Sequence, residues 1–230
     1  MSDDTPGARA ADWTRTRTFA AVAALTVTLA LAAACWIISV GRMSGMNMGA
    51  ATRLGSFAFF VAVWVPMMAA MMLPGAGAAV LRRAYASYGL GAVSGFVIAY
   101  VGVWAAIGVV VYALYRPHGS VAAGVLVIAA GLYELTPFKQ ACRRRCRRDD
   151  RSGFAFGLCC VGSSIGLMVA LLALGLMSVL WMVVITVITV AQKLLPPRAA
   201  MDLPLVLAMV GFGVLIIVAP SSIPGLMPAM

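Results

Sequence analysis

The sequence predicts an all-α protein: a polytopic transmembrane helix bundle of about seven spans, with its amino terminus in the cytoplasm and its carboxyl terminus outside. Of its 230 residues, 63% are hydrophobic and only 10% are charged, which is too little polar surface for a soluble domain of this size. The charges gather in short stretches between long apolar runs, and a bilayer core takes roughly 20 helical residues to cross. No run alternates with period 2, so helices must satisfy the backbone in lipid, and a barrel is excluded.

The apolar runs define the expected spans, and Pro or Gly residues mark most of their ends. Residues 18–219 are therefore expected to form one transmembrane domain, with a cytoplasmic tail at 1–17 and an extracytoplasmic tail at 220–230. The first span passes residues 32–35, Ala-Ala-Ala-Cys, close to a lipoprotein cleavage site, but its apolar residues continue to Val40, so we expect an uncleaved anchor. The seven spans are expected at 18–40, 54–73, 91–115, 120–136, 154–175, 178–194 and 203–219.

The distribution of Lys and Arg gives the orientation. Fourteen of these 17 residues lie in the amino-terminal tail and in every second loop, and three lie on the other side. The larger group is expected in the cytoplasm of a bacterium, with the chain in the inner membrane. The net charge of +10 does not indicate nucleic-acid binding, because the basic residues lie between spans and share no folded face. We expect the loop 139–151 to contact anionic lipid headgroups instead.

Three methionines stand close together in the first expected outside loop. They are Met43, Met46 and Met48, within Met-Ser-Gly-Met-Asn-Met. Thioethers at such spacing suit Cu(I), a soft ion that accepts neutral sulfur ligands. Copper binding is one interpretation of this loop, and packing at the membrane interface in a Met-rich chain is the other.

A second group of methionines lies in the second expected span, between Pro66 and Pro74. These side chains form i,i+4 pairs, which stack on adjoining strips of one helix. A sulfur-lined metal site and adaptable packing against small neighbours both fit this spacing, and spacing alone favours packing. The four residues are Met67, Met68, Met71 and Met72.

Four cysteines lie at the expected cytoplasmic boundary. Cys142 and Cys146 flank three arginines, so on a helix both sulfurs share one face, and the positive charge is expected to lower their pKa. Two thiolates hold Cu(I), or share Zn(II) with other ligands, and Cys159 and Cys160 are near enough in depth to complete a site. The alternative is a basic loop with incidental cysteines. A cytoplasmic location argues against a stable disulfide.

Glu134 is the only acidic residue that the sequence places near a span interior, at the cytoplasmic end of the fourth expected span. An ionisable group there needs a partner or water, and by default it marks a functional site. The alternative is that Lys139, five residues later, neutralises it at the interface. The sequence has no nucleotide-binding loop, no HExxH and no hydrolase serine motif, so we expect no enzymatic activity.

Four stretches of the sequence carry a family resemblance: 64–74, ending Ala-Met-Met-Leu-Pro; 131–139, Gly-Leu-Tyr-Glu-Leu-Thr-Pro-Phe-Lys, with Cys142 and Cys146; 157–168 with 175–182; and 192–196, Gln-Lys-Leu-Leu-Pro. Together they resemble an uncharacterised bacterial family of predicted metal-binding integral membrane proteins, over residues 43–219. The resemblance implies a metal-handling role. The chain is a divergent member, because Gly-Ser-Ser-Ile at 162–165 replaces the usual Gly-Cys-Cys-Trp, Gln192 replaces Glu, and Ser178 replaces Asn.

Two functions follow from these observations. The first is an integral membrane protein that binds or moves a soft metal ion, in first place Cu(I), by exchange between outside Met and cytoplasmic Cys ligands. The second is a non-catalytic accessory or structural subunit of a larger membrane complex, such as a metallo-oxidase. It is motivated by the replaced ligands and by small residues suited to helix contacts. A transporter of organic solutes is disfavoured, because the sequence has no inverted repeat.

Overall fold

The computed structural model describes residues 6–43, 55–86, 90–116, 119–148, 152–175, 178–195 and 199–220. Within these ranges the chain forms eight α-helices and no strand, which confirms the predicted all-α class. The helices are α1 (Pro6–Met43), α2 (Phe57–Ala86), α3 (Leu90–Leu114), α4 (Ser120–Tyr133), α5 (Pro137–Arg148), α6 (Gly153–Leu174), α7 (Val179–Leu194) and α8 (Ala199–Val218).

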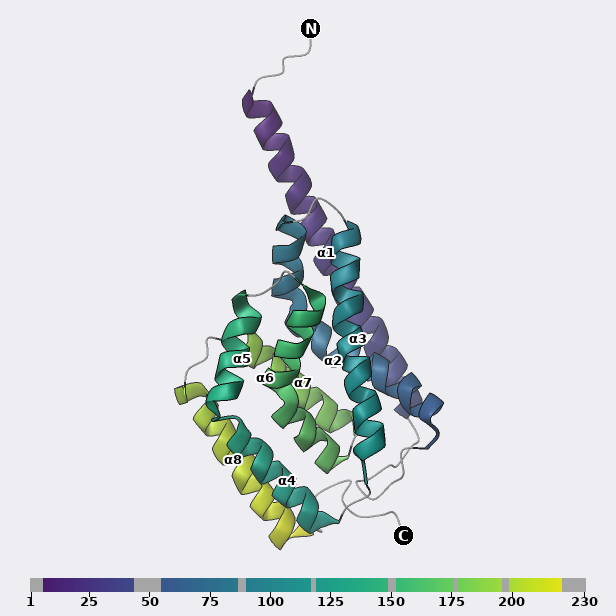
Figure 1. Ribbon diagram of the computed structural model, residues 1–230, viewed down its shortest axis with the longest axis vertical. Helices are drawn as coiled ribbons and strands as arrows, with labels where there is room; N and C mark the ends of the chain where they lie inside the picture. Colours follow the sequence, from purple (N-terminus) through teal and green to yellow (C-terminus); the bar gives the residue numbers. More distant parts are fainter. Residues whose placement is uncertain are drawn as a thin grey trace.

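The helices run back and forth along the long axis of the molecule (Figure 1). α1 packs along α2, and α2 packs on α3 and α7. α6 lies at the centre, where it contacts α3, α4, α5 and α7, while α4 and α8 form an outer pair. Among the long apolar helices, α2 and α6 bury the largest share of their residues, so the core is built around these two.

Four of the described helices are long and apolar enough to cross a bilayer: α1 from Arg15, α2, α3 from Gly91, and α6. α4 and α5 add a fifth candidate if they count as one span bent by 61°. α4 alone has 14 residues, which rise only about 21 Å and fall short of a bilayer core of about 30 Å. The apolar parts of α7 and α8 are also shorter than the four long helices. Helices thus occupy all seven predicted positions, but fewer than seven meet the length criterion.

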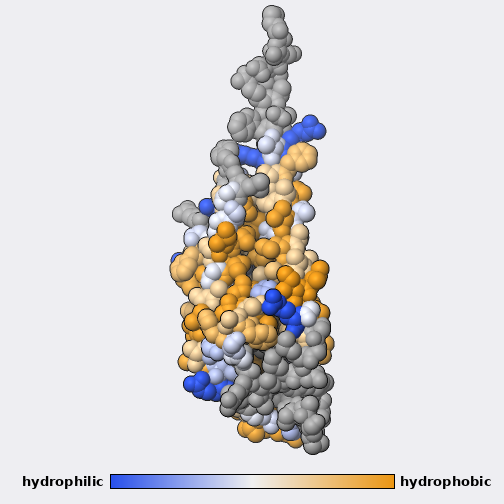
Figure 2. Space-filling model, turned by 90° about the vertical axis from the view of Figure 1, so that its right-hand side faces the viewer, coloured by the Kyte–Doolittle hydropathy of each residue, from blue (hydrophilic) through white to orange (hydrophobic). Residues whose placement is uncertain are grey.

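The outer surface of the bundle is apolar. Figure 2 shows hydrophobic residues over much of the middle of the visible face. Ile37, Leu114 and Val218 each expose about three quarters of their side chains. Soluble monomers rarely leave large contiguous apolar patches uncovered, so this surface is compatible with a lipid environment.

Two helix boundaries differ from the sequence prediction. α1 begins at Pro6, so much of the predicted tail at 1–17 continues the first helix. The predicted fourth span, 120–136, ends at Tyr133, and a new helix begins at Pro137. Thr136 Oγ1 accepts a hydrogen bond from the Lys139 backbone N–H at 3.4 Å, which is an N-cap contact, and Pro137 takes the first helical position, where it loses no bond. The bend therefore has a local cause.

The contact between α4 and α8 depends on two glycines. A Cβ added at Gly213 would lie 2.6 Å from Ile128 Cγ1 and 2.8 Å from the Gly124 carbonyl oxygen. A Cβ added at Gly124 would lie 2.7 Å from the Gly213 carbonyl oxygen. Because carbonyl groups cannot rotate away as side chains do, this close approach requires glycine on both helices.

We predict that Gly213→Ala lowers the stability of the bundle by about 1–3 kcal/mol, the usual cost of overpacking. Gly211→Ala in the same helix is the matched control, since nothing lies within 4 Å of a Cβ there. Thermal unfolding of the purified protein in detergent, followed by circular dichroism, measures both changes. Equal melting temperatures for the two variants would contradict the close packing of α4 on α8.

Candidate metal site

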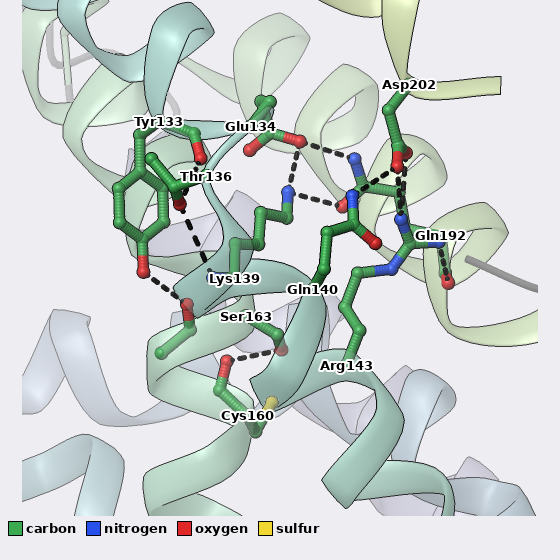
Figure 3. A network of polar contacts seen from close by, with 11 residues as sticks. Tyr133, Glu134, Thr136, Lys139, Gln140, Arg143, Cys160, Ser163, Gln192 and Asp202 are labelled. Carbon is green, nitrogen blue, oxygen red and sulfur yellow. Dashed lines mark hydrogen bonds and ion pairs between the residues drawn. The ribbon is translucent and has the colours of Figure 1, made fainter. Parts of the chain in front are cut away.

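The short basic helix α5 is held against the bundle by two basic side chains that point inward. Lys139 and Arg143 are one helical turn apart, and both are buried although they are charged. Lys139 forms an ion pair with Glu134, the C-cap residue of α4. Arg143 Nη1 donates to both carboxylate oxygens of Asp202 in α8, at 2.8 Å each (Figure 3). Each buried charge of α5 therefore has a partner on another element.

Gln192 of α7 joins the two ion pairs into one network. Its side-chain Oε1 accepts from Lys139 Nζ at 3.0 Å, and its Nε2 donates to Glu134 Oε2 at 2.6 Å (Figure 3). Its backbone oxygen accepts from Arg143 Nη2 at 2.8 Å. The end of α7 is thus held by hydrogen bonds to residues at the end of α4 and on α5.

Glu134 is neutralised by its neighbour, as one of the two sequence interpretations expected. Its side chain is fully buried, and Lys139 and Gln192 both donate to Oε2. Among the residues that the structure describes, Oε1 has no hydrogen-bond partner. Oε1 lies against the bare backbone of Gly166, where a Cβ would be 3.1 Å away.

The next residue of α7, Lys193, reaches a separate group of sulfur and hydroxyl atoms. Its Nζ donates to Cys160 Sγ at 2.9 Å and to Tyr100 OH at 3.5 Å, and it lies 4.0 Å from Met72 Sδ. Tyr100 OH also contacts Cys160 Sγ at 3.1 Å. We call Met72, Tyr100, Cys160 and Lys193 the sulfur cluster. Its members come from α2, α3, α6 and α7, so it forms only when the bundle is assembled.

The two cysteines of α5 both face α6, as their spacing predicts. Cys142 Sγ lies against Gly162, where a Cβ would be 2.7 Å away, and Cys146 Sγ lies 4.0 Å from the Phe156 carbonyl oxygen. All five cysteines of the chain are free thiols. Cys146 also lines a cavity of about 150 Å³ together with Gly75, Ser163, Gln192 and Lys193.

The expected lowering of thiol pKa in α5 is wrong, because burial outweighs the nearby arginines. Burial raises the pKa of the Cys142 thiol, and the Cys159 thiol adds to this, while Arg145 lowers it. Burial raises the pKa of the Cys146 thiol much further; Cys160 adds to it and Lys193 opposes it.

The structure brings together part of the predicted ligand set. Met72 and Cys160 meet around Lys193, and Cys146 lies on α5, which packs on α6. Among the described residues, no group of three or more His, Cys, Asp and Glu side chains is placed to hold a metal, so a site here needs the Met72 thioether. The remaining methionines of α2, which are Met67, Met68 and Met71, are fully buried in the core.

The predicted outside loop is only partly described. Met43 is the last residue of α1 and is buried against the core, so it is not an exposed loop residue as the sequence suggested. Met46 and Met48 lie outside the described residues. The position of the first methionine therefore favours packing, the alternative that the sequence left open for this group.

Sequence reasoning assigned no site role to Lys193, Tyr100 or Asp202. Lys193 and Gln192 belong to a stretch that carries the family resemblance, and this was the one signal for them. Asp202 precedes the last apolar run directly and was left outside the expected span 203–219, although it is almost fully buried. Nothing in the sequence distinguishes Tyr100 from other aromatic residues of the spans.

The described part of the chain is thus an apolar helix bundle in which two sulfur atoms from different helices, Met72 Sδ and Cys160 Sγ, meet around Lys193. Residues 61–216 match a family model described as "Copper chaperone" (PpoB2). The chain belongs to this copper chaperone family, since the match spans well over half of its length. Copper association is thereby supported, in agreement with the metal-handling role that the sequence resemblance implies. No curated protein and no solved structure matches the chain.

We predict that the two thiols of α5 react with maleimide at different rates. The thiolate is the nucleophile, so at about pH 8, near the pKa of free cysteine, Cys146 should be alkylated more slowly than Cys142. Both rates should rise as the pH is raised, because both pKa values are raised. Peptide mass spectrometry of the full chain in detergent, sampled over time, measures each site.

Arg145→Gln is the control for this prediction. Arg145 lowers the pKa of Cys142 and is absent from the influences on Cys146, so its removal should slow the alkylation of Cys142 alone. Faster reaction at Cys146 than at Cys142 would instead support the low pKa that the flanking arginines suggested.

Proposed function

We propose that this protein is an inner-membrane copper chaperone that binds Cu(I) through Met and Cys ligands and passes the ion on without catalysing a reaction. The observation that carries the proposal is the sulfur cluster. Cys160 Sγ and Met72 Sδ, from two different helices, lie within 4.0 Å of one cationic nitrogen. Thiolate and thioether sulfur are soft ligands that select Cu(I) over hard ions.

Cys146 is the proposed third ligand. It lies on α5, which packs on α6, and it lines the cavity together with Lys193, so it can exchange an ion between the cavity and the buried sulfurs. Cu(I) accepts low coordination numbers and exchanges readily between such ligands. The proposed relay connects Met46 and Met48, through Met67, Met68, Met71 and Met72 of α2, with Cys160, Cys146 and the pair Cys142 and Cys159, and an ion can pass along it in either direction.

The proposed topology has seven spans, with the amino terminus inside and the carboxyl terminus outside. It is supported by the fourteen-to-three distribution of Lys and Arg and by the alternating direction of the helices (Figure 1). In this topology α5 lies on the cytoplasmic face. Lys139 and Arg143 are occupied by ion pairs, and Arg147 donates to the carbonyl oxygens of Leu194 and Leu195. Among the described residues of α5, this leaves the exposed Arg144, Arg145 and Arg148 for anionic lipid.

We predict that Cys160→Ser and Met72→Leu each weaken Cu(I) binding by more than the roughly 10–100-fold that loss of an outer-shell partner costs. The measurement is a competition between the purified full chain and a chromophoric Cu(I) chelator, without oxygen. Cys35→Ala and Met209→Leu are the matched controls, since both side chains are buried in α1 and α8, two helices that contribute no member to the cluster. They should bind as the unmodified protein does.

Two outcomes would contradict the proposal. Unchanged affinity in the Cys160→Ser, Met72→Leu double variant would exclude the sulfur cluster as the binding site. A chain that takes up no copper, yet purifies with a partner from native membranes, would point to the accessory-subunit role instead.

The topology gives a separate prediction. A reporter that is active only outside the cytoplasm should be active when fused after the carboxyl terminus, and inactive when fused at Arg148 after α5. Activity at Arg148, or inactivity at the carboxyl terminus, would require a different number of spans or the opposite orientation.

A further inference from the structure

Lys193 separates the cavity from the buried sulfur atoms. Its side chain lines the cavity of about 150 Å³, together with Cys146 and Ser163. Cys160 and Met72, which its Nζ contacts, do not line the cavity and have no exposed surface. An ion that enters the cavity therefore meets the lysine before it meets these two sulfurs.

Gly75 of α2 leaves the space that the side chain of Lys193 occupies. A Cβ added at Gly75 would lie 2.5 Å from Lys193 Cδ, so the alkyl chain of Lys193 passes directly over the bare backbone of Gly75. The ammonium then reaches three acceptors, Cys160 Sγ, Tyr100 OH and Met72 Sδ. Within the described residues it has no carboxylate partner, and its charge is stabilised by these sulfur and hydroxyl atoms and by the Tyr100 ring, whose centroid lies 6.0 Å from Nζ.

We propose that the ammonium of Lys193 occupies the position of the metal ion in the copper-free protein, and that Cu(I) arriving through the cavity displaces it. This inference rests on the proposed copper-binding function. The ammonium of Lys193 is a cation that belongs to the protein itself, and it competes with Cu(I) for the same sulfur ligands. Apparent copper affinity is then reduced by the fraction of molecules in which Lys193 fills the site.

The displaced ammonium has an acceptor in the cavity. Thr189 lies one helical turn before Lys193 on α7 and also lines the cavity. Its Oγ1 is buried and has no hydrogen-bond partner among the described residues. Lys193 can exchange its sulfur contacts for this hydroxyl and for cavity water when the metal enters.

Because one cation is exchanged for another, the site also discriminates between metal ions of different charge. With the Cys160 thiolate as the ligand in both states, a monovalent ion that replaces an ammonium leaves the net charge of the cluster unchanged. A divalent ion adds an uncompensated positive charge, which is costly in a buried site. Among the described residues that line the cavity there is no acidic side chain to offset it. The cluster should therefore favour Cu(I), or Ag(I) as its redox-stable substitute, over Zn(II).

The test is Lys193→Leu, which removes the charge and adds no further sulfur ligand. We expect this variant to bind Cu(I) and Ag(I) about tenfold more tightly than the unmodified chain, because the internal competitor is gone. Zn(II) should bind weakly to both proteins. Affinities are measured in detergent with the full chain, by chelator competition for Cu(I) and Zn(II) and by calorimetry for Ag(I).

A second variant moves the lysine without replacing it. Gly75→Ala places a methyl group against the flexible end of Lys193, so it should also raise the affinity for Ag(I). Gly95→Ala, with nothing within 4 Å of its Cβ, controls for the added methyl group. Arg144→Gln, which removes one exposed charge from α5, controls for the change in net charge. Neither control should change the affinity.

The outcomes separate this inference from the proposed function. If the unmodified chain binds Cu(I) through Cys160 but Lys193→Leu binds with equal or lower affinity, Lys193 is not a competitor and the inference is wrong. It is also wrong if Arg144→Gln raises the affinity as much as Lys193→Leu does. If neither the unmodified chain nor Lys193→Leu binds Cu(I), the proposed function fails and the inference fails with it.

Discussion

A strongly basic helix can pack against an apolar bundle only if the charges on its inner face find partners there. In α5 these charges are Lys139 and Arg143, and the partners are Glu134 and Asp202. Removing one member of such a buried pair leaves an unpaired charge and costs about 3–5 kcal/mol, so the pairs strongly favour this placement of α5 over others. The position of Cys146 against α6 follows from it, because Cys146 lies one turn after Arg143 on the same helix. The proposed metal site therefore depends on ion pairs that contain none of its ligands.

The sequence predicted the helices well because their signal is local. Long apolar runs bounded by Pro and Gly specify each helix, and the structure has a helix at every predicted span. The number of spans is a different question, since it depends on helix length and tilt. α4 ends at Tyr133 because Thr136 and Pro137 start a new helix, and this shortens a span that composition alone extends to residue 136. Hydropathy averages over such a break, so it cannot separate a continuous span from two short helices that meet at an angle.

The site was predictable only where its partners are near in sequence. Glu134 and Lys139 are five residues apart, and their pairing was one of the expected alternatives. The contacts of Arg143 with Asp202, and of Gln192 with Glu134, join residues almost 60 positions apart, so nothing in the local sequence indicates them. Packing between distant segments also explains why four similar methionines of α2 separate into one cluster member, Met72, which is 121 positions from Lys193, and three core residues. Which side chain meets Lys193 is determined by how α2 and α7 pack.

Positions at which the sequence was expected to depart from the family pattern lie in two different environments. Gln192, expected to stand in place of a Glu, points into the ion-pair network and contacts Glu134 and Lys139, not the sulfur atoms. Its neutral amide gives one acceptor to Lys139 and one donor to Glu134, which a second carboxylate cannot do. Residue 192 therefore affects the support of α5 and not the sulfur cluster. Ser163 and Ser164, expected to stand in place of two cysteines, line the cavity one helical turn after Cys159 and Cys160.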